Sequence, residues 1–234
     1  MHKIAIPQSI IDDVVRCRGR EHVFDTLDPA KTALIVVDMQ NAFMLKGVAH
    51  ALCEEAIEIV PNINRLADAV RGTGGVVVWI QTAATPDVIQ SWSVNVEMNG
   101  RERTAHRFES LAPGSKGYEI WADLDVKPVD LKVEKTRYSA FIQGSSNLEA
   151  TLRARGIDTV LITGTVTNVC CESTARDAMM RNFRTIMVTD GNAATSDELH
   201  NASLSAFYLK FGDIMPTDMI IASLTKSARA SAAE

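Results

Sequence analysis

The stretch that most constrains the fold runs from residue 159 to residue 182 and joins a strand to a helix through a turn that carries a cysteine. Residues 159–163 read Thr-Val-Leu-Ile-Thr, an apolar and β-branched run typical of a buried parallel strand, and Gly164 ends it. From Cys171 to Asn182, apolar residues recur at helical spacing. A buried strand followed at once by a helix is the repeating unit of α/β folds.

The same two patterns alternate along most of the chain. Further strands are expected at 32–37, 76–80, 129–134, 184–189 and 214–215, and further helices at 10–15, 53–71, 147–155, 197–210 and 217–224. This alternation predicts an α/β fold, a three-layer α/β/α sandwich around a mainly parallel sheet. Right-handed crossovers would bring the carboxyl ends of the strands to one rim, where α/β sheets bind ligands.

No linker divides the chain into large units. Residues 29–226 are expected to form one domain, preceded by an N-terminal arm (1–28) and followed by a frayed tail (227–234). The arm could pack on a neighbouring subunit or lie on the surface as a solvated segment. Residues 83–120 have little pattern and are expected to be an irregular insertion of the kind that holds lids and specificity residues.

Composition excludes several classes of function. The net charge of −5, with dispersed Lys and Arg, argues against binding to nucleic acid or to an anionic membrane surface. The apolar runs are strand-sized, too short to span a membrane, and early carboxylates argue against a secretory signal. The four cysteines, at 17, 53, 170 and 171, show no disulfide framework or metal spacing. These features predict a cytoplasmic protein that acts on a small molecule.

Cys170 is the first candidate for chemistry. It stands at or just before the first helical turn, where unpaired backbone N–H groups and the positive end of the helix dipole favour a thiolate. The same N–H groups could hold an oxyanion. A lone cysteine is more often a buried structural residue than a catalytic one, so the assignment of Cys170 depends on the neighbouring sequence.

The segment Gly164 to Ala178, GTVTNVCCESTARDA, resembles the signature of the isochorismatase-like cysteine hydrolases. In that family a strand ends in Gly, a Thr-Asp/Asn-x-Cys turn follows, and a Thr-x-x-Asp-Ala helix leads away. The resemblance makes Cys170 the nucleophile and Cys171 a small core residue. It also implies a Rossmann-like six-stranded sheet, a homodimer or homotetramer, and a cis peptide between Val166 and Thr167 that turns N–H groups toward an oxyanion.

Two other strand ends carry motifs similar to those of the same family. Asp38-Met39-Gln40-Asn41-Ala42-Phe43 resembles a DxQxxF box, in which the Asp is the general base, and residues 135–141, KTRYSAF, resemble a Lys-x-x-x-Ser-x-Phe element. The predicted catalytic residues are therefore Asp38, Lys135 and Cys170. Lys135 would favour the thiolate by its charge, and Asp38 would accept the thiol proton.

The RYSAF run, together with Gln81, is closest to the ureidoacrylate amidohydrolase and N-carbamoylsarcosine amidohydrolase branch of the family. The resemblance proposes as substrate contacts Gln81, Asn41, Phe43, Arg137 and Tyr138. Many nicotinamidases take metal ligands from the segment after the second strand, but here it reads QTAATPDVIQSW, without a histidine. No metal or other cofactor is expected, and the nicotinamidase interpretation is weakened.

The predicted reaction is hydrolysis of a C–N bond in a small amide or ureido compound through a thioester on Cys170, with Val166 and Thr167 forming the oxyanion site together with the Cys170 N–H. Four alternatives stay open: a thiol redox or sensing protein with Cys171 as resolving partner, a nicotinamidase or maleamate-type amidase, a catalytically silent binding protein, and a vinyl-ether-cleaving isochorismatase. A cysteine in the nucleophile position argues against the last.

Overall fold

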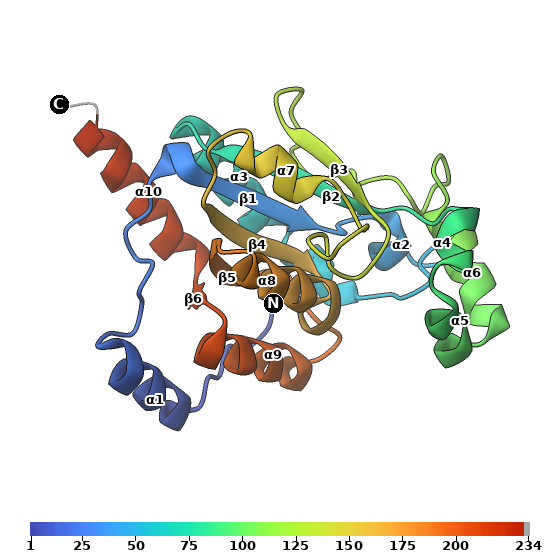
Figure 1. Cartoon of the computed structure of the whole chain (residues 1–234), viewed down its shortest axis with the longest axis horizontal. Helices are drawn as coiled ribbons and strands as arrows, with labels where there is room; N and C mark the ends of the chain where they lie inside the picture. Colours follow the sequence, from blue (N-terminus) through green and yellow to red (C-terminus); the bar gives the residue numbers. More distant parts are fainter. Residues whose placement is uncertain (232–234) are drawn as a thin grey trace.

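The computed structural model describes residues 1–231, and a six-stranded parallel sheet forms its centre (Figure 1). The strands are β1 (Thr32–Val37), β2 (Val76–Thr82), β3 (Leu131–Lys135), β4 (Thr159–Thr165), β5 (Arg184–Ala193) and β6 (Asp213–Met215). Their order is β3-β2-β1-β4-β5-β6, and all five pairings are parallel. The predicted Rossmann-like sheet is confirmed, and its strand order reverses between β1 and β4.

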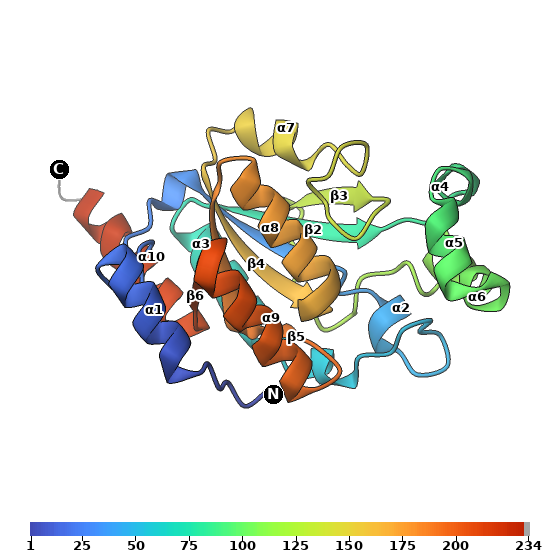
Figure 2. The same cartoon turned by 60° about the horizontal axis from the view of Figure 1, so that its bottom comes forward.

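Helices cover both faces of the sheet. On one face lie α3 (Val60–Gly72) and α10 (Thr217–Ser231). On the other lie α7 (Leu148–Arg153), α8 (Glu172–Met180) and α9 (Asp197–Lys210), and Figure 2 shows α8 and α9 in front of the sheet and α7 at the top. Leu34 and Val36 of β1 face the first layer, whereas Ile35 and Val37 face the second. All four are fully buried, which is why the strand reads as a continuous apolar run. The predicted three-layer α/β/α sandwich is confirmed.

Several helix boundaries differ from expectation, two of them by the largest margins. The single helix expected from residue 53 is divided into the 3₁₀ turn η2 (Glu54–Ile57) and α3, because Pro61 in the first turn lacks an N–H and cannot continue a helix that began earlier. At the other end, α10 runs to Ser231, so residues 227–231 are helical rather than frayed. The remaining residues of the predicted tail lie outside the described part of the chain.

The N-terminal arm packs on its own chain. Its helix α1 (Gln8–Arg18) buries Val14 and contacts α9, and the Arg18 guanidinium donates to the carbonyl of Gly212 at 3.0 Å. The short 3₁₀ turn η1 (Pro29–Lys31) then leads into β1. The arm thus packs along its own chain while most of its residues stay exposed, and a contact with a neighbouring subunit stays a prediction.

Residues 86–111 form three helices, so the expectation of an irregular insertion was wrong. They are α4 (Pro86–Gln90), α5 (Ser93–Asn99) and α6 (Arg101–Leu111), called the cap below. Figure 1 shows the cap at the end of the molecule toward which β1 and β2 run, with the short helix α2 (Asn41–Met44) nearby. Of α6, only Thr104, Ser110 and Leu111 are buried, which explains why the sequence shows no apolar helical stripe.

Gly164 is required where β4 approaches β1. Its φ is +114°, and a Cβ added there would lie 2.0 Å from the Val37 carbonyl oxygen. We expect Gly164→Ala to lower the free energy of unfolding by about 3 kcal/mol or more, measured by urea denaturation. Gly74→Ala is the control, because Gly74 has φ +94° but open space around it. It should cost only about 1 kcal/mol, and equal losses in the two variants would contradict the steric explanation.

Candidate active site

The carboxyl ends of three strands bring Asp38, Lys135 and Cys170 together, as predicted. Asp38 directly follows β1, Lys135 ends β3, and Cys170 lies in the short helical turn η3 (Thr167–Cys171) after β4. Asp38 has a φ of +52°, a left-handed conformation that Asp tolerates better than most residues, and its N–H donates to the Ile80 carbonyl at 3.0 Å. The three side chains are buried.

Lys135 is the centre of the contacts. Its Nζ lies 2.8 Å from Asp38 Oδ2 and donates to Thr82 Oγ1 at 2.6 Å, to the Arg137 carbonyl at 3.0 Å and to Cys170 Sγ at 3.7 Å. An ammonium has three protons, so these four neighbours compete for them. Asp38 Oδ2 is held beside the ammonium mainly by opposite charge. It is the natural acceptor for a proton from Cys170.

Thr82 also belongs to this cluster, although it was not among the predicted site residues. Its hydroxyl accepts from Lys135 and donates to Asp38 Oδ1 at 2.9 Å, so it bridges the two charged groups. Gln81 was proposed instead, but successive residues of a strand face opposite sides of the sheet. The Gln81 amide donates to the Tyr118 carbonyl and does not line the cavity beside Cys170. Strand alternation would have identified Thr82 if the face of β2 had been known.

The surroundings of the Cys170 thiol favour its neutral form. Burial raises its pKa to about 12; the Lys135 charge lowers it, while the charge of Asp38 and a hydrogen bond to that carboxylate raise it further. The surroundings of Cys170 therefore do not favour the expected thiolate, because burial and Asp38 outweigh the effect of the ammonium on the pKa. Burial also disfavours the charge of Lys135, but the Asp38 carboxylate outweighs this and the pKa of Lys135 is raised. The resting site holds a thiol beside an ion pair.

The turn between β4 and α8 that carries Cys170, called the nucleophile turn below, has its cis peptide one residue earlier than expected. The cis peptide joins Thr165 to Val166, not Val166 to Thr167. Thr165 is the last residue of β4 and still pairs with Ala193 of β5, so the chain changes direction directly after the last sheet contact. The Val166 carbonyl then accepts from the N–H groups of Val169 and Cys171. The oxyanion role of Val166 and Thr167 stays a prediction.

The two neighbouring cysteines face different surroundings. Cys171 is fully buried, its Sγ donates to the Thr163 carbonyl at 3.9 Å, and burial raises its pKa well above the ordinary value. Cys170 instead lines a cavity of about 280 Å³. Only Cys170 is therefore placed to meet a small molecule.

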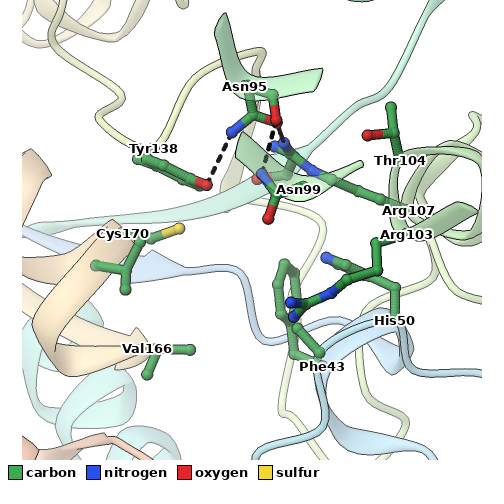
Figure 3. Close-up of a pocket in the computed structure, with 13 residues that line it drawn as sticks. Phe43, His50, Asn95, Asn99, Arg103, Thr104, Arg107, Tyr138, Val166 and Cys170 are labelled. Atoms are coloured by element: carbon green, nitrogen blue, oxygen red, sulfur yellow. Dashed lines mark hydrogen bonds between the residues drawn. The ribbon is translucent and has the colours of Figure 1, made fainter. Parts of the chain in front are cut away.

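The cavity lies between the rim of the sheet and the cap (Figure 3). Its lining combines residues of both parts: Phe43, His50, Ala51, Thr82, Tyr138, Val166, Val169 and Cys170 from the body of the fold, and Asn95, Asn99, Arg103, Thr104 and Arg107 from the cap. The predicted contacts Phe43 and Tyr138 are among them. The sequence thus predicted that the insertion would hold residues of the site, but it did not identify which residues of the insertion line the cavity.

Two other predicted contacts lie outside this lining. The Asn41 amide donates to the Lys116 carbonyl at 2.9 Å, and Arg137 Nη2 donates to the Ser91 carbonyl at 3.1 Å. Arg137 contributes to the site through its backbone carbonyl, which accepts from Lys135. Over residues 1–231, no three His, Cys, Asp or Glu side chains gather as a metal site, and none of the helices is both long and apolar enough to cross a membrane.

Comparison with known proteins points to one family. Residues 32–219 match the model of the isochorismatase domain. The ureidoacrylate amidohydrolase RutB of Caulobacter vibrioides is 34% identical over 204 residues, which cover 82% of this chain and 90% of that protein. RutB of Agrobacterium fabrum is 35% identical over 177 residues, 70% of this chain and 77% of that protein.

Solved structures give the same result. A cysteine hydrolase from Pseudomonas syringae pv. phaseolicola matches with a TM-score of 0.73 and 28% identity, covering 86% of this chain and 95% of that one. The N-carbamoylsarcosine amidase of Thermoplasma acidophilum matches with a TM-score of 0.65 and 30% identity, covering 80% and 97% of the two chains. The likeness extends over nearly the whole length of both structures.

The opposite effects of Asp38 and Lys135 on the thiol can be measured by alkylation. In a Cys17→Ser background, which removes the exposed thiol, we expect Asp38→Asn to speed the reaction of Cys170 with iodoacetamide at pH 8.5 about tenfold. Lys135→Met should slow it by a similar factor, because the charge that favours the thiolate is lost. Labelling is assigned by mass spectrometry, with Cys170→Ser as control. Equal rates in the two variants would contradict the assigned electrostatics.

Proposed function

The chain belongs to the isochorismatase family, and from this premise we propose that it is a cysteine-dependent amidohydrolase that cleaves the C–N bond of a small ureido or carbamoyl compound. The observation that carries the proposal is the contact of Lys135 with both Asp38 and Cys170 beside the cavity. A nucleophile, a base and a group that orients them are the parts that acyl transfer needs.

The reaction begins when Asp38 Oδ2 takes the proton of Cys170. The sulfur attacks the carbonyl carbon, and a tetrahedral intermediate forms with a negative oxygen. The backbone N–H groups of Thr167 and Cys170 hold that oxygen, while Lys135 keeps the carboxyl group in position. The raised pKa of Cys170 is consistent with this order, because the thiol loses its proton only as the new C–S bond forms.

The C–N bond then breaks, and the protonated Asp38 returns its proton to the departing ammonia or amine. An acyl or carbamoyl group is left on Cys170 as a thioester or thiocarbamate. Asp38 next removes a proton from water, the hydroxide attacks this group, and the C–S bond breaks to restore the thiol. From a ureido compound the released carbamic acid decomposes to carbon dioxide and ammonia.

The alternatives have less support. A redox protein that uses Cys171 as resolving partner would need that sulfur near the cavity, but Cys171 is fully buried and donates to the Thr163 carbonyl. A nicotinamidase or maleamate-type amidase could use the same triad, but the segment after β2 has no histidine of the kind that many nicotinamidases use to bind a metal. RutB and N-carbamoylsarcosine amidase, the named relatives, favour ureido and carbamoyl compounds. A cytoplasmic location and a homodimeric or homotetrameric state are part of this proposal.

The proposal is tested by ammonia release from ureidoacrylate, N-carbamoyl amino acids, biuret, nicotinamide and maleamate. Wild type should release ammonia from at least one ureido compound, with or without excess EDTA. Cys170→Ala should lose activity by at least about 10⁴-fold, because the nucleophile is gone. Cys171→Ala is the matched control and should keep turnover. Activity that survives in Cys170→Ala would exclude the proposed nucleophile.

A further inference from the structure

The cap gives the cavity a positively charged wall. Arg103 and Arg107 line the cavity on the side opposite Cys170 (Figure 3), and no Asp or Glu is among the lining residues. Neither arginine forms a salt bridge within residues 1–231, whereas the one buried carboxylate near the cavity, Asp38, is already paired with Lys135. The wall therefore carries two positive charges without a protein counter-charge.

Arg107 is held firmly in this wall. Its Nη1 donates to Asn95 Oδ1 at 2.7 Å, and its guanidinium lies 5.1 Å from the ring centre of Trp92 and 5.6 Å from that of Tyr138. Asn95 in turn donates to the Tyr138 hydroxyl at 3.0 Å. A guanidinium fixed by an amide and two aromatic rings is pre-organised for a planar anion.

His50 adds no charge to this wall. Burial and the neighbouring Arg107 lower the pKa of His50 to about 3, so its imidazole is neutral at physiological pH. Its Nδ1 has no hydrogen-bond partner in the described structure. Among these side chains, the positive charge of the wall therefore comes from Arg103 and Arg107.

We propose that Arg103 and Arg107 form a carboxylate subsite, so that the substrate has a carbamoyl group at the Cys170 end and a carboxylate at the cap end. This inference rests on the proposed function and names the substrate as a small ureido acid. Guanidinium groups bind carboxylates through paired hydrogen bonds, and a cavity of about 280 Å³ limits the distance between the two ends to that of a small molecule.

The test compares N-carbamoyl-β-alanine with its uncharged methyl ester by ammonia release. Arg103→Gln and Arg107→Gln should each raise KM for the acid about 10- to 100-fold with little change in kcat, and should leave the ester unaffected. Arg101→Gln is the matched control, because Arg101 is exposed on the same helix and does not line the cavity. A wild-type preference for the ester, or equal losses on both compounds, would overturn the subsite.

A binding measurement tests the carboxylate subsite independently of the proposed catalytic function. If wild type releases ammonia from neither compound, calorimetry of N-carbamoyl-β-alanine with Cys170→Ala still tests the subsite. Binding that weakens about 10- to 100-fold in Cys170→Ala with Arg103→Gln, but not with Arg101→Gln, would support it. No binding, or binding that is insensitive to Arg103→Gln, would overturn it.

A second, independent observation concerns the far side of the nucleophile turn. His200 is fully buried, its Nε2 lies 3.0 Å from the Thr189 carbonyl, and its Nδ1 lies 2.9 Å from Thr167 Oγ1. A carbonyl can only accept, so Nε2 carries the proton and Nδ1 accepts from the Thr167 hydroxyl. Ser203, also on α9, lies 3.3 Å from the Thr167 carbonyl, but its one hydroxyl proton has a shorter contact with Glu172 Oε2 at 2.7 Å. His200 is therefore the residue of α9 that holds the Thr167 side chain.

His2 supports this arrangement from the arm. Its ring stacks on His200 with centres 4.4 Å apart. The Ala194 N–H donates to His2 Nε2 at 3.0 Å, so Nδ1 carries the proton and donates to Asp197 at 2.7 Å. We infer that His200, supported by His2, is a positioning residue that fixes Thr167 and thereby the backbone N–H groups facing the oxyanion.

His200→Leu removes the acceptor for Thr167 and should lower kcat about 10- to 100-fold with KM nearly unchanged, on samples matched for folded fraction by circular dichroism. His200→Asn keeps an acceptor near the Nδ1 position and should restore most of kcat. A kcat of wild-type size in His200→Leu, or no rescue by Asn, would overturn the inference. If His200→Leu does not fold, His2→Leu is measured instead. An unchanged kcat in His2→Leu would then overturn the inference that His200, supported by His2, positions Thr167.

Discussion

The buried ion pair between Lys135 and Asp38 is the interaction on which the site depends. Both side chains are fully buried, and bringing two charges out of water costs several kcal/mol per ion unless hydrogen bonds satisfy them. Thr82 and the Arg137 carbonyl provide those bonds. Because Asp38, Thr82 and Lys135 stand at the ends of three adjacent strands, β1, β2 and β3, the pair also fixes these ends relative to one another. Loss of one partner would leave the other charge buried and uncompensated.

The same pair sets the resting state of the nucleophile. A thiolate at Cys170 would gain the attraction of Lys135 but would face the carboxylate of Asp38 in a buried site, and the net result is a thiol. Redox-sensing cysteines are exposed and have low pKa values, and Cys170 has neither property. These charges therefore favour a thiol that loses its proton to Asp38 only when a substrate carbonyl lies beside it.

The sequence predicted those parts of the fold whose pattern reflects burial. The bounds of β1 and α9 match expectation, because continuous apolar burial in β1 and the Ser196 cap of α9 leave clear signals. The triad was proposed from three motifs that resemble those of the family, each at the end of an expected strand, and the structure places the three side chains together. The helices of the cap were missed, since they bury few apolar side chains. Gln81 was proposed from the family resemblance, and the sequence could not correct this choice, because period-two alternation does not reveal which face of a strand meets the site.

Chemistry and recognition come from different parts of the molecule. The sheet supplies the triad, whose positions are fixed by strand register, whereas the cap supplies the charged wall of the cavity. The two parts meet in one turn: the Arg137 carbonyl accepts from Lys135, and the next residue, Tyr138, accepts from Asn95 of the cap. The positions of the cap and of the ammonium are therefore linked through consecutive residues. Substitutions in α6 can change the group that the cavity accepts without disturbing the buried ion pair, provided that this turn is kept.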